Sequence, residues 1–292
     1  MTFPMFQQSV LHIKINFVNR CNMNKPTPRL LLLRLLTVAE ANTLTASEAV
    51  LAGSIFGMTE NSIRVTLARL TQAELAEAAG PANYRLGPKA QKLGADVALW
   101  HTADKRTVKS DGSWIAVATG GLPRSDRKVL RARARALSLL GFRELEKGLY
   151  LRPNNLLGGI DVVRKRLLDL GLEEEAAVFK ANDFDDVRQK EALELWSDIH
   201  LEKHYEKMSQ QLTGWLQHMD ELPPDIALRE IFILGDAGIR SVIFDPLLPT
   251  PLVDEEARQK YFDTVRRINE EGRRLWFAFF KDVSTLESVQ AE

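Results

Sequence analysis

The chain of 292 residues has one cysteine, Cys21, which excludes an internal disulfide and a cluster of thiolate metal ligands. It also has no apolar run near the roughly 20 residues that a membrane-spanning helix needs. Polar residues interrupt the first 22 residues, which therefore do not have the continuous apolar core of a secretion signal. We expect a cytoplasmic protein with no membrane partner, in which residues 1–24 are a disordered arm or a mis-called start.

Net charge is absent as well, because 39 basic residues balance 39 acidic ones. No overall field attracts nucleic acid, so any affinity for DNA must come from local patches. Between Lys25 and Trp100, eight basic residues face six acidic ones, a surplus of two. One copy of this region would bind DNA weakly, whereas a homodimer would add the contacts of two half-sites.

Two helix starts follow each other closely in the amino-terminal third of the chain. Thr45 and Glu48 form a capping box, the apolar positions after them indicate a helix, and Gly57 ends it. Thr59 then caps a second helix, which we expect from Glu60 to about Leu75. The spacing is typical of a helix-turn-helix.

The second helix has two different faces. Ile63, Leu67 and Leu70 form one narrow apolar stripe that would be buried. The other face offers an amide suited to adenine, a guanidinium suited to guanine and small apolar groups for thymine methyls, while its hydroxyls and flanking cations suit phosphates. The candidate DNA contacts are Thr59, Asn61, Ser62, Arg64, Val65, Ala68, Arg69 and Arg85. A small core helix of an unrelated domain would also fit this helix taken alone.

A short hairpin follows the two helices. Leu75–Glu77 and Tyr84–Leu86 read as strands joined by a turn at Gly80–Asn83. Helix, turn, helix and two-stranded wing is the order of a winged helix, and we assign residues 25–105 to such a domain. The wing tip is neutral, so phosphate contacts would come from its base, at Arg85 and Lys89.

Residues 106–184 alternate strand and helix. We expect a strand at Trp114–Ala118, a hairpin over residues 142–151 and a strand at Ala176–Phe179. Helices at Arg124–Leu140 and Ile160–Leu170 separate them. Strand, helix, hairpin, helix, strand is a ferredoxin-like arrangement. The outer face of the first helix carries five cations, and it is either a solvated face or a contact surface for DNA or phosphate. These cations are Arg127, Lys128, Arg131, Arg133 and Arg135.

Residues 185–292 read as a helical domain. One long amphipathic helix is expected at Lys190–Gln217, a buried helix from Ile226 to about Ile243, and a last helix from Asp254 to Phe280. The aromatic residues here suit a core or dimer interface, or alternatively a pocket for a flat apolar ligand. The fold class is therefore α+β: a winged helix, a ferredoxin-like domain and a helical domain.

Several short segments of the sequence resemble those of a known protein family. They are the stretches 59–70 and 114–118, Gly141-Phe142 leading to 148–153, and Arg240 followed by 245–249. In their order and spacing, over roughly residues 28–280, the chain resembles the PaaX family of phenylacetate-degradation transcriptional repressors. The resemblance implies a dimeric winged-helix repressor of an aromatic-acid catabolic operon, bound to a pseudo-palindromic operator. It also implies that an acyl-coenzyme A effector such as phenylacetyl-coenzyme A releases the repressor from DNA. The candidate contacts of this effector are Trp196, His200, Tyr205 and Arg240.

The sequence gives little support for an enzymatic function. The middle domain of the family looks like a small CRISPR nuclease subunit, which places an aspartate after its first strand, but Ala118–Gly121 contains no carboxylate. His200 and His204 are four residues apart, yet Leu201 stands where a zinc hydrolase needs glutamate. No phosphate-binding glycine loop or nucleophile elbow occurs. We expect no catalytic residue, metal or cofactor; the alternative to a DNA-binding regulator is a protein-interaction module whose winged helix binds a partner protein.

Overall fold

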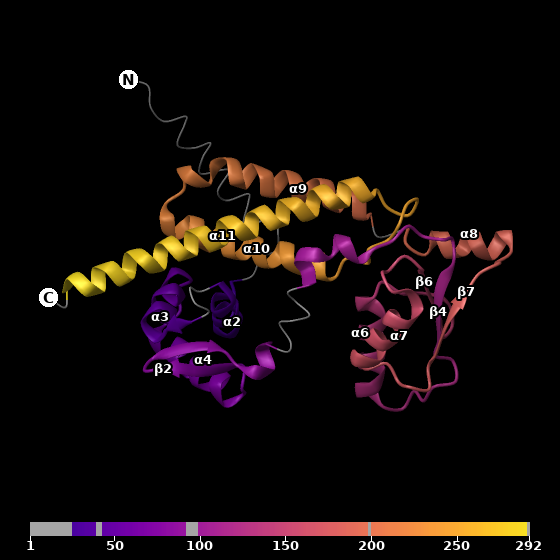
Figure 1. The fold of residues 1–292 in the computed structure, drawn as a ribbon, viewed down its shortest axis with the longest axis horizontal. Helices are drawn as coiled ribbons and strands as arrows, with labels where there is room; N and C mark the ends of the chain where they lie inside the picture. Colours follow the sequence, from indigo (N-terminus) through magenta and orange to yellow (C-terminus); the bar gives the residue numbers. More distant parts are fainter. Residues whose placement is uncertain (1–24, 39–42, 92–98, 198–199, 291–292) are drawn as a thin grey trace, which may run out of the picture. The chain divides into compact units, whose positions relative to one another are not determined.

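The computed structural model describes residues 25–38, 43–91, 99–197 and 200–290, which form helices and two antiparallel sheets (Figure 1). The expected mixture of helix and sheet is confirmed. Contacts divide the chain into two compact units, one of Met1–Leu99, Gln210–Ile239 and Thr264–Glu292, the other of Trp100–Ser209 and Arg240–Asp263. The proposed arm at residues 1–24 lies outside the described residues. None of the described helices has a stretch long and apolar enough to span a bilayer.

The amino-terminal part of the first unit has three helices and a three-stranded sheet. The helices are α2 (Pro28–Val38), α3 (Ala46–Ile55) and α4 (Glu60–Gln72). The strands β1 (Leu44–Thr45), β2 (Ala76–Gly80) and β3 (Asn83–Leu86) lie in the order β1-β3-β2, with Leu44 opposite Tyr84 and Ala76 opposite Leu86. The hairpin agrees with the expectation. Strand β1 was not expected, because two residues are too few to give a pattern.

Local capping sets the helix boundaries. The Thr45 hydroxyl accepts from the Glu48 amide at 3.0 Å while the Glu48 carboxylate accepts from the Thr45 amide at 2.7 Å, so the capping box is confirmed. Gly57, at φ 61°, follows the end of α3. Helix α4 ends earlier than expected, because Glu74 is left-handed (φ 58°) and the Leu75 amide donates back to the Leu70 carbonyl at 2.9 Å.

The core of the first unit forms around α4. Its expected stripe of Ile63, Leu67 and Leu70 is at most 1% exposed, and four fully buried leucines of α2 belong to the same core, namely Leu31, Leu32, Leu35 and Leu36. Helix α3 approaches α4 closely, because a Cβ on Gly53 would lie 2.7 Å from Ile63 Cγ1. Only glycine fits there without displacing Ile63.

Polar and aromatic contacts join α2 and α3 to the carboxy-terminal helices of this unit. Arg34 pairs with Asp236 at 2.7 Å, and Arg229 Nε donates to the Ile55 carbonyl at 3.1 Å. The Phe56 ring lies 5.3 Å from Phe232, edge to face. Helix α10 (Pro224–Ile243) supplies these partners, and Trp276 of α11 (Glu255–Gln290) stacks on the Phe56 ring at 6.5 Å.

The second unit has a four-stranded sheet, in the order β5-β6-β4-β7. In chain order its elements are β4 (Trp114–Ala118), α6 (Arg127–Leu139), β5 (Arg143–Glu146), β6 (Leu149–Pro153), α7 (Gly159–Asp169) and β7 (Ala177–Ala181). They agree in type and order with the expected elements. The central strand β4 pairs antiparallel with β6 and β7, and Ile115 and Val117 on it are fully buried.

One cation of α6 is not on the outer face, where we expected it. Arg133, expected on the outer face, is instead 6% exposed, and its guanidinium forms an ion pair with Glu173 and donates to the Pro123 carbonyl at 3.0 Å. The ion pair raises the pKa of Arg133 and lowers that of Glu173. The placement was wrong because Arg133, at about 100° per residue, falls between the buried Ala136 and Leu137, where Glu173 from the segment after α7 supplies a carboxylate.

The helix expected at Lys190–Gln217 is two helices, so that prediction was wrong. Helix α8 (Asp186–Glu194) ends before Trp196, and α9 (Leu201–His218) begins after His200, which has φ 47°. The Trp196 indole stacks on Trp114 at 5.9 Å and donates to the Gly141 carbonyl at 3.3 Å. This aromatic contact fixes the chain at the break. The last helix, in contrast, continues ten residues beyond the expected Phe280.

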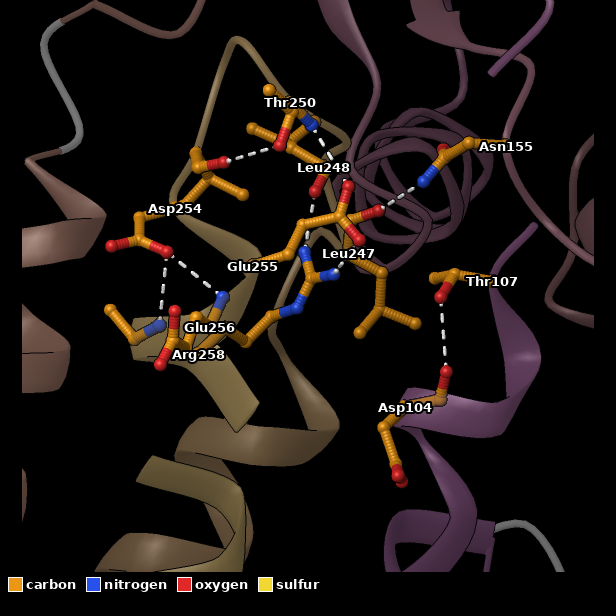
Figure 2. A network of polar contacts seen from close by, with 12 residues as sticks. Asp104, Thr107, Asn155, Leu247, Leu248, Thr250, Asp254, Glu255, Glu256 and Arg258 are labelled. Carbon is orange, nitrogen blue, oxygen red and sulfur yellow. Dashed lines mark hydrogen bonds and ion pairs between the residues drawn. The ribbon is translucent and has the colours of Figure 1, made fainter. Parts of the chain in front are cut away.

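The segment before α11 is held by polar contacts within the second unit (Figure 2). Asn155 Nδ2 donates to the Leu247 carbonyl at 2.6 Å, and the buried Arg258 guanidinium donates to the Leu248 carbonyl. Asp254 caps α11 by accepting from the amides of Glu256 and Ala257. Buried carbonyls of the segment thus find donors, as burial of polar backbone requires.

The close approach at Gly53 gives a stability prediction. Gly53→Val places a branched side chain against Ile63, and we expect the free energy of unfolding to fall by about 1–3 kcal/mol through overpacking. Urea denaturation measures the change. Ser54→Val, at the next and exposed position of α3, is the control, since it adds the same side chain without the clash and removes only the exposed hydrogen bond from Ser54 Oγ to the Leu51 carbonyl. Equal losses in the two variants would contradict the packing account.

Candidate nucleic-acid interface

Helix α4 presents the expected polar face to solvent. Asn61, Arg64, Ala68 and Arg69 are exposed, and the Val65 side chain is 40% exposed. They lie opposite the buried stripe of the same helix. In this unit, an amide, two guanidinium groups and two small apolar side chains therefore form one continuous exposed face.

Carboxylates hold three cations of this region, and this pairing was not expected from the sequence. Arg64 pairs with Glu60 at 2.7 Å, Arg85 with Glu77 at 2.6 Å, and Lys89 with Glu74 at 3.1 Å. Glu60 and Arg64 are one helical turn apart, a spacing that could have revealed the pair in the sequence. Exposed pairs of this kind contribute about 0–1 kcal/mol, so an incoming phosphate or base can displace the carboxylate at little cost.

Arg69 differs from the other two arginines. Within the described residues it has no carboxylate at ion-pair distance, and it is exposed on the last turns of α4. Its guanidinium is available to an external anion without breaking a contact in the protein.

The two hydroxyl residues at the start of α4 are engaged locally. The Thr59 side chain accepts from the Ser62 amide at 3.3 Å and so caps the helix. Ser62 is half-buried, and its carbonyl accepts from the Thr66 hydroxyl at 2.7 Å. Thr59 therefore has a structural role that is independent of any nucleic acid.

The wing carries its charge at the base. Residues Gly80, Pro81 and Ala82 at the tip are exposed and uncharged. Arg85 on β3 stands opposite Glu77 on β2 in the strand register, and this explains their ion pair. The tip can approach a surface closely but offers no charge to a phosphate.

The candidate effector contacts do not gather in one place. The second unit has a cavity of about 430 Å³, lined on its aromatic side by Trp196, Phe142, Tyr150 and Phe244. Among the described lining residues there is no His200, Tyr205 or Arg240. His200 and Arg240 are exposed, at the start of α9 and near the end of α10.

Tyr205 is buried and bonded inside the second unit. Its hydroxyl donates to Asp245 at 2.6 Å, and the Leu247 amide donates to the same carboxylate at 2.8 Å. Burial raises the pKa of Asp245, while the two hydrogen bonds and the nearby Arg258 act in the opposite direction. Burial also raises the pKa of Tyr205 above its usual range. This hydroxyl supports a buried carboxylate and does not face the cavity.

No metal centre emerges from the described part of the chain, where no three histidine, cysteine, aspartate or glutamate side chains are grouped to hold an ion. His204 hydrogen-bonds to Ser241 at 2.9 Å, and burial lowers its pKa.

Comparison with known proteins yields a fold likeness. No protein-family model and no curated protein matches the chain. A solved structure of the uncharacterized protein Rv0674 from Mycobacterium tuberculosis is similar, with a TM-score of 0.58 and 19% sequence identity over 86% of this chain and 99% of that one. At this identity the likeness concerns the fold alone.

The capping contact of Thr59 predicts a stability change. Thr59→Ala removes the acceptor for the Ser62 amide, and we expect the free energy of unfolding to fall by about 1 kcal/mol. Thr59→Asn, which keeps a capping oxygen, should unfold like the wild type in a urea titration. A Thr59→Ala variant of unchanged stability would show that the cap contributes nothing.

The Tyr205–Asp245 contact predicts a pH-dependent effect. Asp245 has a raised pKa in the fold, so its contribution to stability falls as the pH rises from its unfolded value towards the folded one. The Tyr205 hydroxyl bonds the ionised carboxylate more strongly than the neutral acid, so the cost of Tyr205→Phe, about 1–3 kcal/mol, should grow as the pH rises through the folded pKa of Asp245. Denaturation over a series of pH values measures this. In the Asp245→Asn background the pH dependence of the Tyr205→Phe effect should disappear; if it persists, another group is responsible.

Proposed function

We propose that the chain is a sequence-specific DNA-binding transcriptional regulator that inserts α4 into the major groove. The observation that carries the proposal is the exposed face of α4, where Asn61, Arg64, Val65 and Ala68 lie opposite the buried stripe. An ordinary solvated helix face is rich in Glu–Lys pairs, whereas this one has the single pair Glu60–Arg64 and otherwise carries side-chain types that read base edges.

The element order supports a winged helix in the first unit. Helices α2, α3 and α4 are followed by the β2–β3 hairpin, and β1 extends the hairpin to a three-stranded sheet. In a helix-turn-helix the second helix of the pair contacts bases with its first turns while its neighbour positions it. We assign these roles to α4 and α3. In the second unit, the strand order β5-β6-β4-β7 with two intervening helices supports a ferredoxin-like domain.

The proposed contacts divide into two kinds. Asn61, Arg64, Val65 and Ala68 read bases, while Ser62, Arg69 and Arg85 hold phosphates. Arg64 would leave Glu60 to reach a guanine. The exposed ion pair is worth about 0–1 kcal/mol, and a bidentate base contact about 1–3 kcal/mol, so the exchange favours the complex.

A homodimer and an effector complete the proposal. The small basic surplus of one subunit favours two copies on a pseudo-palindromic operator. The effector would be an aromatic acid or its coenzyme A thioester, as in a PaaX-type repressor of an aromatic-acid operon, with its ring in the cavity beside Trp196. It releases DNA only through unequal affinity for the two states of the protein. The protein acts in the cytoplasm and catalyses no reaction.

A selection experiment tests the general function. Full-length protein is incubated with a pool of random duplexes, and the bound fraction is amplified and sequenced. A regulator enriches one motif, and its affinity falls steeply with added salt because phosphate contacts release counterions. A protein-interaction module would enrich no motif, and its apolar interface would bind a partner protein with little dependence on salt.

Arg64 provides the sharpest single test. Arg64→Ala should weaken binding to the selected operator by about 1–3 kcal/mol and relax the preference at one base pair. Binding isotherms on the operator and its single-base variants measure both effects. Arg29→Ala on α2, an exposed arginine outside the proposed face, is the control of equal charge change. Uniform weakening on every duplex would assign Arg64 to a phosphate instead.

A further inference from the structure

Helix α6 of the second unit has an unusual charge composition. Its sequence, Arg127–Leu139, contains five cations and no acidic residue. Arg133 is buried against Glu173, and the other four are exposed. These four define the α6 basic face: Arg127, Lys128, Arg131 and Arg135.

The four side chains point in one direction. At about 100° per residue they fall within an arc of about 100°, opposite the buried Ala136 and Leu137. Arg127, Arg131 and Arg135 repeat every fourth residue and so form a row about 12 Å long. Ala134 and Ser138 lie beside the row and are also exposed, so no bulky side chain covers it.

Within the described residues no carboxylate lies at ion-pair distance from any of the four. Other helices of this chain bring their own counter-charges: Arg164 pairs with Asp161 on α7, Arg188 with Glu191 on α8, and Arg274 with Glu271 on α11. Like charges one turn apart repel each other and destabilise a helix. The α6 basic face therefore carries a repulsion that no ion pair among the described residues relieves.

We propose that the α6 basic face is a second DNA-contact surface, which binds the phosphate backbone of duplex DNA without reading its sequence. This inference extends the proposed regulator function and rests on it. Cations that neutralise phosphates release the counterions condensed on DNA, and this release is the source of sequence-independent affinity. The face would supply the positive charge that the neutral wing tip and the ion-paired arginines of the first unit do not.

The shape of the face favours a duplex over a small anion or an acidic peptide. The row lies on the convex surface of the helix, and the cavity beside it is lined by Ala134 and Ser138 but by none of the four cations, so they do not enclose a free phosphate. Its length of about 12 Å spans about seven backbone charges of a duplex, since these occur every 1.7 Å or so of the helix axis. Three of the four cations are arginines, whose planar fork binds phosphate oxygens in pairs.

The test is the salt dependence with which full-length protein binds a random-sequence duplex, measured by fluorescence anisotropy. Arg131→Gln/Arg135→Gln removes two central cations and keeps helix propensity. We expect the slope of log K against log salt to become shallower by about two, and affinity at low salt to fall more than about tenfold. The control Arg188→Gln/Lys190→Gln has the same charge change on α8, where each cation has a carboxylate partner. It should change the slope by less than half as much.

Each outcome separates this inference from the proposed function. If Arg131→Gln/Arg135→Gln binds like the wild type while Asn61→Ala/Arg64→Ala loses the operator preference, the α6 surface is wrong and the regulator stands. If the α6 variant loses duplex affinity while Asn61→Ala/Arg64→Ala keeps the operator preference, the α6 surface stands and α4 is not the reader. Three other outcomes would overturn the proposal. The α6 and α8 variants could lose equal affinity, or the wild type could bind no duplex at all. The third is an α6-dependent affinity for single-stranded RNA or polyglutamate but not for duplex DNA.

Discussion

Burial of one stripe of α4 is the constraint on which the first unit depends. Ile63, Leu67 and Leu70 are packed into the core, and Gly53 allows α3 to approach Ile63 without a side chain between them. Because a helix has only one opposite side, this packing places Asn61 and Arg64 in solvent. The base-reading role that we propose for α4 follows from that orientation. A rotation of α4 by a quarter turn would expose leucine in place of these side chains.

Charge is distributed differently in the two units. In the first, carboxylates neutralise Arg64, Arg85 and Lys89 until another anion replaces them, and Arg69 has no such partner among the described residues. Such pairing lowers affinity for any duplex and leaves discrimination to the base contacts. In the second unit the α6 basic face has no such partners among the described residues. One chain of zero net charge can therefore hold a selective surface and an unselective one.

Buried polar groups organise the second unit. Asp245 accepts from Tyr205 and from the Leu247 amide, and Asn155 and Arg258 satisfy the carbonyls that follow. Unpaired, each of these groups would cost about 1–3 kcal/mol, so the segment between α10 and α11 has few alternative conformations. Trp196 occupies the break between α8 and α9 and lines the cavity that we propose for an effector.

Local signals in the sequence determined the element types. The capping box at Thr45, the stripe at Ile63 and the alternation of strands and helices from Trp114 to Ala181 depend on neighbours within one or two turns, and the structure confirms them. Contacts between distant residues decided the rest. Arg133 is buried beside Glu173, which is 40 residues away in the chain but adjacent in the fold. The expected long helix breaks where Trp196 stacks on Trp114. Periodicity reports which side of a helix is apolar, but only the tertiary structure supplies the partner that a charged or aromatic side chain finds.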